Sequence, residues 1–166
     1  MFVVNLIEKR PLAGCRQDQD RGVGMRISDV LRGKGSEVAT VAPGIGVDEL
    51  VAVLAERNVG ALVVVDGGAV VGIVSERDVA RGLHEHGAAV LGLRVADVMT
   101  SPVLGCAPDD SVDSLAATMT ERRIRHLPVL DGGDLVGIVS IGDVVKSHIS
   151  QLEASRDQLE SYIAQG

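Results

Sequence analysis

Apolar residues along most of the chain form either short continuous runs or stripes with helical spacing. Residues 38–41 and 61–65 are short runs of β-branched and aliphatic residues, which is typical of buried strands. Between them, apolar residues recur three and four positions apart, and this spacing predicts an amphipathic helix over 47–57. An Asp-Gly-Gly hairpin then leads into a second strand over 69–74, and Ser75 is placed to begin another helix.

The same order of elements returns in the second half of the chain. From the first short strand to the helix that follows the hairpin, equivalent residues are 65 positions apart, so that Asp78 corresponds to Asp143. Upstream, Asp29 matches Asp97 at a shift of 68, because the first loop is three residues longer. A repeat of this length cannot close its own core. We therefore expect an α/β (α+β) fold with two pseudo-symmetric β-α-β-β-α repeats packed back to back, sheets inside and helices outside.

The repeat also sets the expected division of the chain. We predict five segments: a flexible N-terminal extension, a first repeat, a connector, a second repeat and an extension of the last helix, over residues 1–24, 25–85, 86–95, 96–150 and 151–166. In the last helix, Ile149, Leu152, Leu159 and Ile163 share one face. That face either packs on a second copy of the chain or belongs to a frayed terminus.

Composition and charge narrow the function. The chain has 166 residues, of which 46% are hydrophobic and 1% aromatic, so the core must be aliphatic. The formal net charge of −7 argues against a non-specific nucleic-acid surface or an anionic-membrane surface, but it allows a small anionic ligand in a local basic pocket. The opening apolar run is too short to span a membrane, and the charged residues 8–10 follow it, the reverse of a signal peptide. We predict a cytoplasmic protein.

No catalytic arrangement is evident in the sequence. Cys15 and Cys106 are far apart and in no C-x-x-C spacing, so neither a disulfide framework nor a zinc site is indicated. Cys106 has the context of a small apolar strand residue, and His126 lacks an orienting partner that the sequence identifies. There is no P-loop. We predict that the protein is not an enzyme and carries no catalytic cofactor.

Both copies of the Gly-Ile-Val-Ser segment end where a helix is predicted to begin. Ser75 and Ser140 occupy the N-cap position, and Asp78 and Asp143 follow in the first turn. One interpretation is purely structural, because a Ser cap and an early carboxylate stabilise a helix start. The other is a ligand site, in which a phosphate meets the hydroxyl and free N–H groups and the Asp binds the hydroxyls of a ribose.

Several motifs together resemble a known family. They are residues 97–100 (Asp-Val-Met-Thr), 107–112 (Ala-Pro-Asp-Asp-Ser-Val), 125–129 (Arg-His-Leu-Pro-Val) and both Gly-Ile-Val-Ser-x-x-Asp segments. Over about residues 26–150 they resemble the cystathionine-β-synthase-type (CBS) domain, present as a tandem pair. The resemblance implies a disc-like, stand-alone Bateman module, commonly a homodimer. It also implies a sensor of adenine nucleotides or adenosyl compounds that has no catalysis of its own and regulates another protein.

The resemblance also implies two ligand clefts. Asp78 and Asp143 would bind ribose, and Ser75 and Ser140 would meet phosphate. The residues expected in the first cleft are Thr40, Ala61, Val63, Ser75, Arg77 and Asp78. Those expected in the second are Arg125, His126, Pro128, Ser140 and Asp143. We expect the first cleft to be preferred by a phosphorylated ligand, because Gly142 replaces Arg77 in the second.

Two functions of different classes follow. The leading hypothesis is a regulatory module that binds AMP first, and ATP, ADP or an adenosyl compound next, and signals through a conformational or dimer change. The alternative is a structural or interaction dimer with degenerate clefts and no nucleotide ligand. Substitution of Asp78 separates them, since it abolishes binding with the fold retained in the first case and disturbs the fold in the second.

Overall fold

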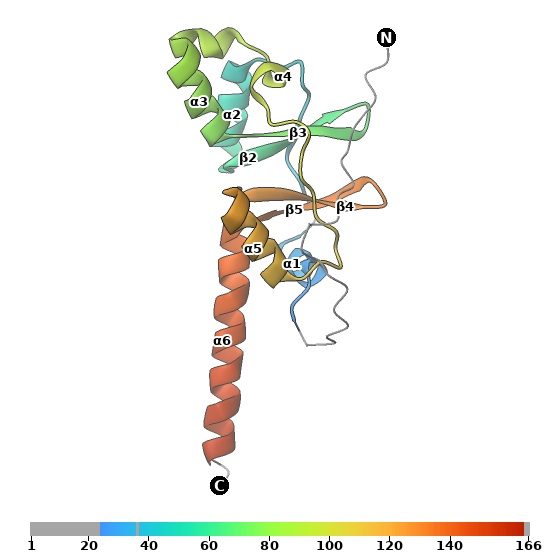
Figure 1. Cartoon of the computed structure of the whole chain (residues 1–166), viewed down its shortest axis with the longest axis vertical. Helices are drawn as coiled ribbons and strands as arrows, with labels where there is room; N and C mark the ends of the chain where they lie inside the picture. Colours follow the sequence, from blue (N-terminus) through green and yellow to red (C-terminus); the bar gives the residue numbers. More distant parts are fainter. Residues whose placement is uncertain (1–23, 36, 165–166) are drawn as a thin grey trace.

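The computed structural model describes residues 24–35 and 37–164, so all but the last residue of the predicted N-terminal extension lie outside the described residues. Figure 1 shows two sheets facing each other, with helices on their outer sides. In chain order the elements are α1 (Ile27–Lys34), β1 (Thr40–Val41), α2 (Val47–Arg57), β2 (Ala61–Asp66), β3 (Ala69–Ser75), α3 (Glu76–His86), the 3-10 helix η1 (Gly87–Gly92), α4 (Val95–Val98), α5 (Val112–Arg122), β4 (His126–Asp131), β5 (Asp134–Ser140) and α6 (Ile141–Ala164). The expected α+β architecture is confirmed.

The two repeats have matching strand registers. In the first sheet, of order β1-β2-β3, Ala61 is paired with Ser75 across the antiparallel β2–β3 ladder. In the second, His126 is paired with Ser140 across β4–β5. In each hairpin, the last residue of the second strand is therefore paired with the first residue of the first strand. A helix begins directly after that last residue. Both candidate Ser positions therefore lie at the same end of their sheets.

Local differences from the expected elements are small. β1 is shorter than the predicted strand over 38–41, because only Thr40 and Val41 pair with β2. Its counterpart in the second repeat is a single parallel bridge between Cys106 and Val129. At the other end of the first loop, α1 ends at Lys34.

The core is aliphatic, as its composition predicts. One buried cluster fills each repeat, and a third lies between the two sheets, where Val63, Val70 and Ile73 meet Val103. Burying one such side chain stabilises the fold by about 1.5–3 kcal/mol. The third cluster holds the two sheets face to face and thereby fixes how the ends of the two repeats meet.

The two repeats exchange their opening helices. Ile27 of α1 is buried in the core of the second repeat, and Val95 of α4 is buried in the core of the first. The backbone repeats this symmetry: the Ile27 amide donates to the Asp110 carbonyl at 3.0 Å, and the Val95 amide donates to the Ile45 carbonyl at 2.9 Å. The segments predicted as 25–85 and 96–150 are thus sequence repeats, whereas each packed unit combines parts of both.

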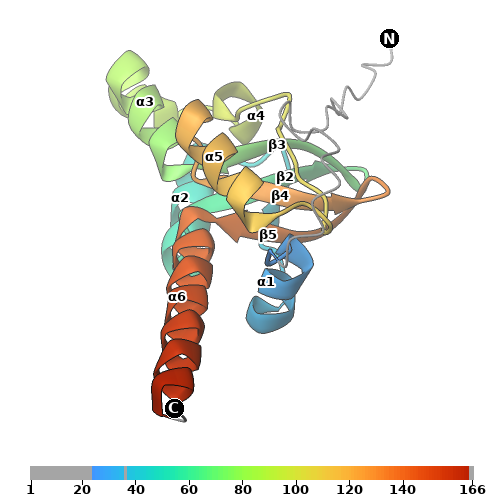
Figure 2. The same cartoon turned by 60° about the horizontal axis from the view of Figure 1, so that its bottom comes forward.

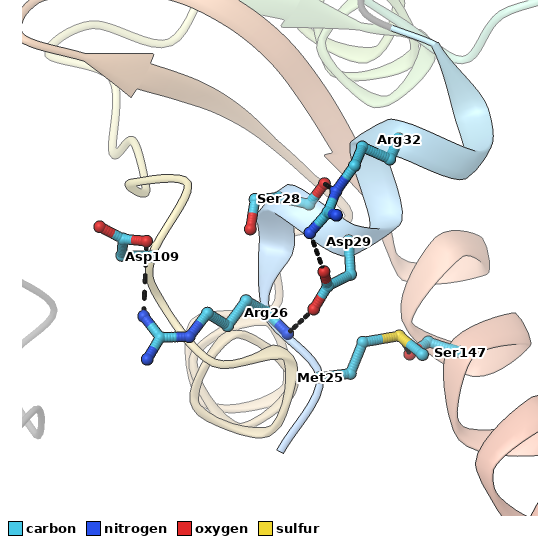
Figure 3. A network of polar contacts seen from close by, with 7 residues as sticks. All are labelled: Met25, Arg26, Ser28, Asp29, Arg32, Asp109 and Ser147. Carbon is cyan, nitrogen blue, oxygen red and sulfur yellow. Dashed lines mark hydrogen bonds and ion pairs between the residues drawn. The ribbon is translucent and has the colours of Figure 1, made fainter. Parts of the chain in front are cut away.

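Side-chain contacts also hold the start of the described chain against the second repeat (Figure 3). The Arg26 guanidinium donates to Asp109 at 3.4 Å. The hydroxyl of Ser147, a buried residue of α6, donates to the sulfur of Met25 at 2.7 Å. These contacts link α1 to both the α5 side of the second repeat and the first turns of α6.

Helix α6 is 24 residues long and extends well beyond the two sheets (Figures 1 and 2). Nearly every residue from 151 to 164 is exposed, including the stripe formed by Leu152, Leu159 and Ile163. Among the described residues, no helix combines the length and apolar character that crossing a bilayer requires.

Candidate functional site

A cavity of about 360 Å³ lies between the two repeats, at the N-terminus of α3. The first repeat and the segment after α4 supply one wall, and the segment between α5 and β4 supplies the other. The lining residues are Gly60, Ala61, Ile73, Ser75, Glu76, Arg77, Asp78, Arg81, Thr100, Arg122, Arg123, Ile124, Arg125 and His126. We call this cavity the Asp78 pocket.

The two oxygens of Asp78 have different surroundings. Oδ2 accepts hydrogen bonds from the Ser75 amide at 2.8 Å and the Ser75 hydroxyl at 2.7 Å, which ties the start of α3 together. Within the described part of the chain, Oδ1 has only longer contacts, to the Thr100 hydroxyl at 3.4 Å and the Arg81 guanidinium at 3.6 Å. Oδ2 therefore stabilises the start of the helix, as the structural interpretation predicts. Oδ1 retains acceptor capacity for the hydroxyls of a ligand.

The Asp78 pocket is strongly basic although the chain is acidic. Its lining contains five arginines against two carboxylates, a formal excess of three positive charges, whereas the whole chain carries −7. Two of the arginines connect the walls, because Arg77 at the start of α3 donates to the Arg123 carbonyl at 2.8 Å. Guanidinium groups beside a helix N-terminus form an environment that favours phosphate or another anion.

His126, the first residue of β4, adds a titratable group to this pocket. Burial, followed by the positive charges of Lys34 and Arg125, lowers the pKa of His126. At neutral pH the imidazole is therefore uncharged, with one nitrogen donating and the other accepting. The imidazole lies beside Gly60, since a Cβ built on that glycine would be 3.4 Å from the His126 ring, an ordinary van der Waals contact.

In the second repeat, the residue equivalent to Asp78 is Asp143, which is hydrogen-bonded to a lysine. Asp143 Oδ2 accepts from the Ser140 amide and hydroxyl, both at 2.7 Å, and from the Lys34 ammonium at 2.6 Å. Burial acts to raise the pKa of Asp143, but the hydrogen bonds from Lys34 and Ser140 outweigh it, and the pKa is lowered. Asp143 is thus a paired carboxylate.

The structure brings together four of the six residues expected in the first cleft. Ala61, Ser75, Arg77 and Asp78 line the Asp78 pocket. Thr40, which is exposed at the start of β1, is not part of the lining. Val63 is fully buried between the sheets, and its amide donates to the Ala39 carbonyl, so it does not face the pocket.

The residues expected in the second cleft are divided. Arg125 and His126 line the Asp78 pocket, where the sequence had grouped them with Asp143. The reason is the face-to-face packing of the repeats, which places the segment between α5 and β4 opposite the start of α3. Pro128 is buried, and its carbonyl accepts from the Cys106 amide at 3.0 Å.

Several residues of these sites were not predicted from the sequence, among them Arg81, Thr100 and Lys34. Arg81 follows Asp78 by three residues, and this helical spacing was the available signal that both lie on one face. Thr100 belongs to the Asp-Val-Met-Thr motif, but only the tertiary structure brings it to Asp78. Nothing in the sequence around Lys34 pointed to Asp143.

The buried thiol of the described chain does not resemble a nucleophile. Cys106 is 5% exposed, and burial, followed by the negative charge of Asp110, raises its pKa to about 12. Nucleophilic cysteines are thiolates with lowered pKa in accessible, electropositive surroundings. Cys106 therefore has the properties of a core residue.

Comparison with known proteins agrees with this architecture. The family model of the CBS domain matches residues 27–85 and 95–149. The CBS domain-containing protein CBSX3, mitochondrial, from Arabidopsis thaliana is 34% identical over 161 residues, which cover 92% of this chain and 78% of that protein. The CBS-domain containing protein ATU1752 from Agrobacterium tumefaciens has a solved structure that is 40% identical, with a TM-score of 0.74, covering 77% of this chain and 96% of that one.

Two similar structures contain ligands. CBSX2 in complex with AMP is 29% identical, with a TM-score of 0.64, and the match covers 76% of this chain and 98% of that one. The CBS domain pair of protein MJ0100, in complex with 5-methylthioadenosine and S-adenosyl-L-methionine, is 28% identical, with a TM-score of 0.64, and the match covers 80% of this chain and 98% of that one.

Proposed function

The chain belongs to the CBS-domain family, and from this premise we propose that it is a regulatory module that binds an adenine nucleotide in the Asp78 pocket. The observation that carries the proposal is that one cavity contains both a carboxylate oxygen with acceptor capacity and a cluster of arginines. Asp78 Oδ1 is the ribose acceptor, and the arginines are the phosphate ligands. The AMP bound by CBSX2 supports this ligand class.

The charge of the pocket favours some of the possible ligands over others. A phosphorylated nucleotide suits its excess of three positive charges, so AMP comes first and ATP and ADP next. S-adenosylmethionine ranks after them because its sulfonium cation is repelled by the arginines, although the MJ0100 domain pair binds it. The purine lies between aliphatic side chains, Ile73 and Ile124, and the strand backbone at Ala61.

Binding would signal because the pocket belongs to both repeats. A nucleotide held by Asp78 on one wall and by Arg122 and Arg125 on the other draws α3 and α5 together. The protein carries no catalytic step in this proposal, and the regulated partner is another chain. A ligand shifts the equilibrium between two arrangements of α3 and α5 only if it binds one arrangement more tightly than the other.

A second candidate, an interaction dimer without a nucleotide, is favoured by the exposed face of α6. Val145, Ile149, Leu152, Leu159 and Ile163 are spaced 4, 3, 7 and 4 residues apart, and all are at least half exposed. We propose that a second copy of the chain covers this face. The two functions are compatible, because a dimer is a structure whose shape a bound nucleotide can change.

Calorimetric titration with AMP, ADP, ATP and S-adenosylmethionine tests the proposal, with Asp78→Asn as the key variant. Asparagine retains an oxygen that accepts from the Ser75 amide, so α3 keeps its start while the charged acceptor is lost. One hydrogen bond to a charged group is worth about 1.5–3 kcal/mol, so AMP affinity should fall about 10- to 150-fold.

Asp134→Asn, an exposed carboxylate at the start of β5, is the charge-matched control and should bind AMP like the wild type. Equal AMP affinity in wild type and Asp78→Asn would remove the proposed role of Asp78. Absence of binding of all four compounds to a folded protein would overturn the nucleotide proposal and leave the interaction dimer.

A further inference from the structure

The second cleft differs from the first in that a lysine ammonium is hydrogen-bonded directly to its carboxylate. Lys34 Nζ lies 2.6 Å from Asp143 Oδ2 and also donates to the Ile138 carbonyl at 3.2 Å. Ile138 is the repeat equivalent of Ile73, which lines the Asp78 pocket. The ammonium group therefore lies between the carboxylate and the strand, the place that corresponds to the open pocket of the first repeat.

The placement of Lys34 results from the exchange of opening helices. Lys34 is the last residue of α1, and α1 packs on the second repeat through buried Ile27. At the equivalent position after α4 the chain has Pro102, which carries no charge. Besides its capping bonds from Ser75, Asp78 contacts the Thr100 hydroxyl and the Arg81 guanidinium, at 3.4 and 3.6 Å, both longer contacts than the lysine makes with Asp143.

The arginines of the Asp78 pocket are mostly missing from the second cleft. The residues equivalent to Arg77, Arg123 and Arg125 are Gly142, Asn58 and Gly60. The other two, Arg81 and Arg122, correspond to Lys146 and Arg57, so a phosphate at the second cleft would lose three of the five cationic side chains that surround the first. Lys34, the cation in contact with Asp143, is bonded to the carboxylate needed for ribose.

We propose that Lys34 occupies the ribose position of the second cleft, so that each chain binds one nucleotide, at Asp78, and the Asp143 cleft becomes available only when Lys34 leaves it. The inference rests on the proposed function and adds its stoichiometry and the residue that sets it. Its physical basis is competition for one place, because the ammonium, held by Asp143 Oδ2 and the Ile138 carbonyl, lies between the carboxylate and the strand where the ribose would have to lie.

Calorimetry with AMP and with ATP measures the stoichiometry in five proteins: the wild type, Asp78→Asn, Lys34→Met, Lys34→Met combined with Asp143→Asn, and Lys146→Met. Methionine keeps an unbranched side chain of similar length and removes the charge. We expect one site per chain in the wild type, lost in Asp78→Asn. Lys34→Met should show two sites, the added one lost when Asp143→Asn is combined with it. Lys146→Met, which removes an exposed lysine of α6, should keep one site.

The results separate this inference from the function on which it rests. Two sites in the wild type, or one site in Lys34→Met, would overturn the role of Lys34 while the Asp78 site stands. No binding to the wild type, with one Asp143-dependent site in Lys34→Met, would uphold the role of Lys34 and overturn the Asp78 site. No binding to either protein would overturn both.

A measurement without ligand tests the contact itself. Lys9, Lys34 and Lys146 are the lysines of the chain, so acylation by an amine-reactive ester can be followed at each by mass spectrometry. Lys34 should react several-fold more slowly than Lys146, and the difference should disappear in Asp143→Asn, because the Lys34 ammonium is held by the Asp143 carboxylate and the Ile138 carbonyl and is less accessible to the ester. Equal rates in the wild type would show that the contact is not kept and would overturn the inference.

Discussion

Asp78 and Asp143 are equivalent residues that differ in their neighbours. Each accepts two hydrogen bonds from its own helix-capping serine, and these bonds follow from local sequence. The additional partners differ: a hydroxyl and a more distant guanidinium near Asp78, an ammonium at 2.6 Å from Asp143. The two carboxylates therefore have the same local motif but different neighbours from distant parts of the chain.

The Lys34–Asp143 contact predicts a pH dependence of stability. The pKa of Asp143 is lowered in the folded protein relative to its ordinary value of 3.8, so the contact stabilises the fold above that value and is lost as pH falls through the lower, folded pKa. We expect the free energy of unfolding to decrease below about pH 4, and to decrease less in Asp143→Asn. Urea unfolding between pH 7 and pH 3 measures both, with Asp134→Asn as the control. The same acid-induced loss in wild type and Asp143→Asn would contradict the pairing.

At the scale of elements, α1 and α4 connect the repeats, because each packs against the repeat to which it does not belong in sequence. Each begins a sequence repeat but contributes its buried residue to the opposite core, and equivalent backbone hydrogen bonds fasten both. The docking of α1 is what brings Lys34 to the second cleft. The short helix is therefore part of the site although it contains none of the motif residues.

This docking predicts a large effect of truncating Ile27. The side chain is fully buried in the second repeat, and deleting such a side chain costs about 2–5 kcal/mol because a cavity remains. Ile27→Ala should lower the urea midpoint accordingly, and Val95→Ala, its counterpart in the first repeat, should lower the same transition by a smaller amount. Leu83→Ala, at an exposed site on α3, is the control and should change the unfolding free energy by less than about 0.5 kcal/mol. A similarly small effect of Ile27→Ala would contradict the docking of α1.

On the scale of the whole molecule, the ligand pocket and the α6 face lie on different parts of the structure. The pocket lies between the repeats, and the apolar residues of the α6 face are exposed. In Figure 1, α6 extends away from the two sheets. A dimer formed through α6 would leave the pocket open to a nucleotide. Regulation by ligand and association of two copies can therefore be tested independently.

The α6 face predicts a dimer that two charges would disrupt. Leu152 and Leu159 are 70% and 65% exposed, and replacing both by glutamate places carboxylates in the centre of the proposed interface. Light scattering coupled to size-exclusion chromatography should give twice the chain mass for wild type and the single-chain mass for the double variant. Gln151→Glu combined with Gln158→Glu adds the same charge elsewhere on α6 and should leave the dimer intact. A monomeric wild type would show that the second copy is not the partner.

Much of the fold and part of the site could be predicted from the sequence, and the reason is that these features are local. The hairpins, the helix spacing and the Ser-x-x-Asp helix starts depend on residues within a few positions of one another. The constant shift of 65 residues then identified two copies of one unit, and the CBS motifs identified their family. Ala61, Ser75, Arg77 and Asp78, all expected in one cleft, line the same pocket because they flank one strand pair and one helix start.

The tertiary structure alone decided which distant residues meet. Lys34 and Asp143 are 109 residues apart, and Arg77 and Arg123 are 46 apart, so no local pattern links them. Their contacts depend on how two nearly identical units are placed against each other, which the burial of the core between the sheets determines. The sequence therefore determined the repeats, their family and the capped helix starts. The packing of the repeats placed the arginines opposite Asp78 and a lysine opposite Asp143. The hydrophobic effect that drives this packing depends on the apolar area buried and not on how far apart the residues are in the sequence.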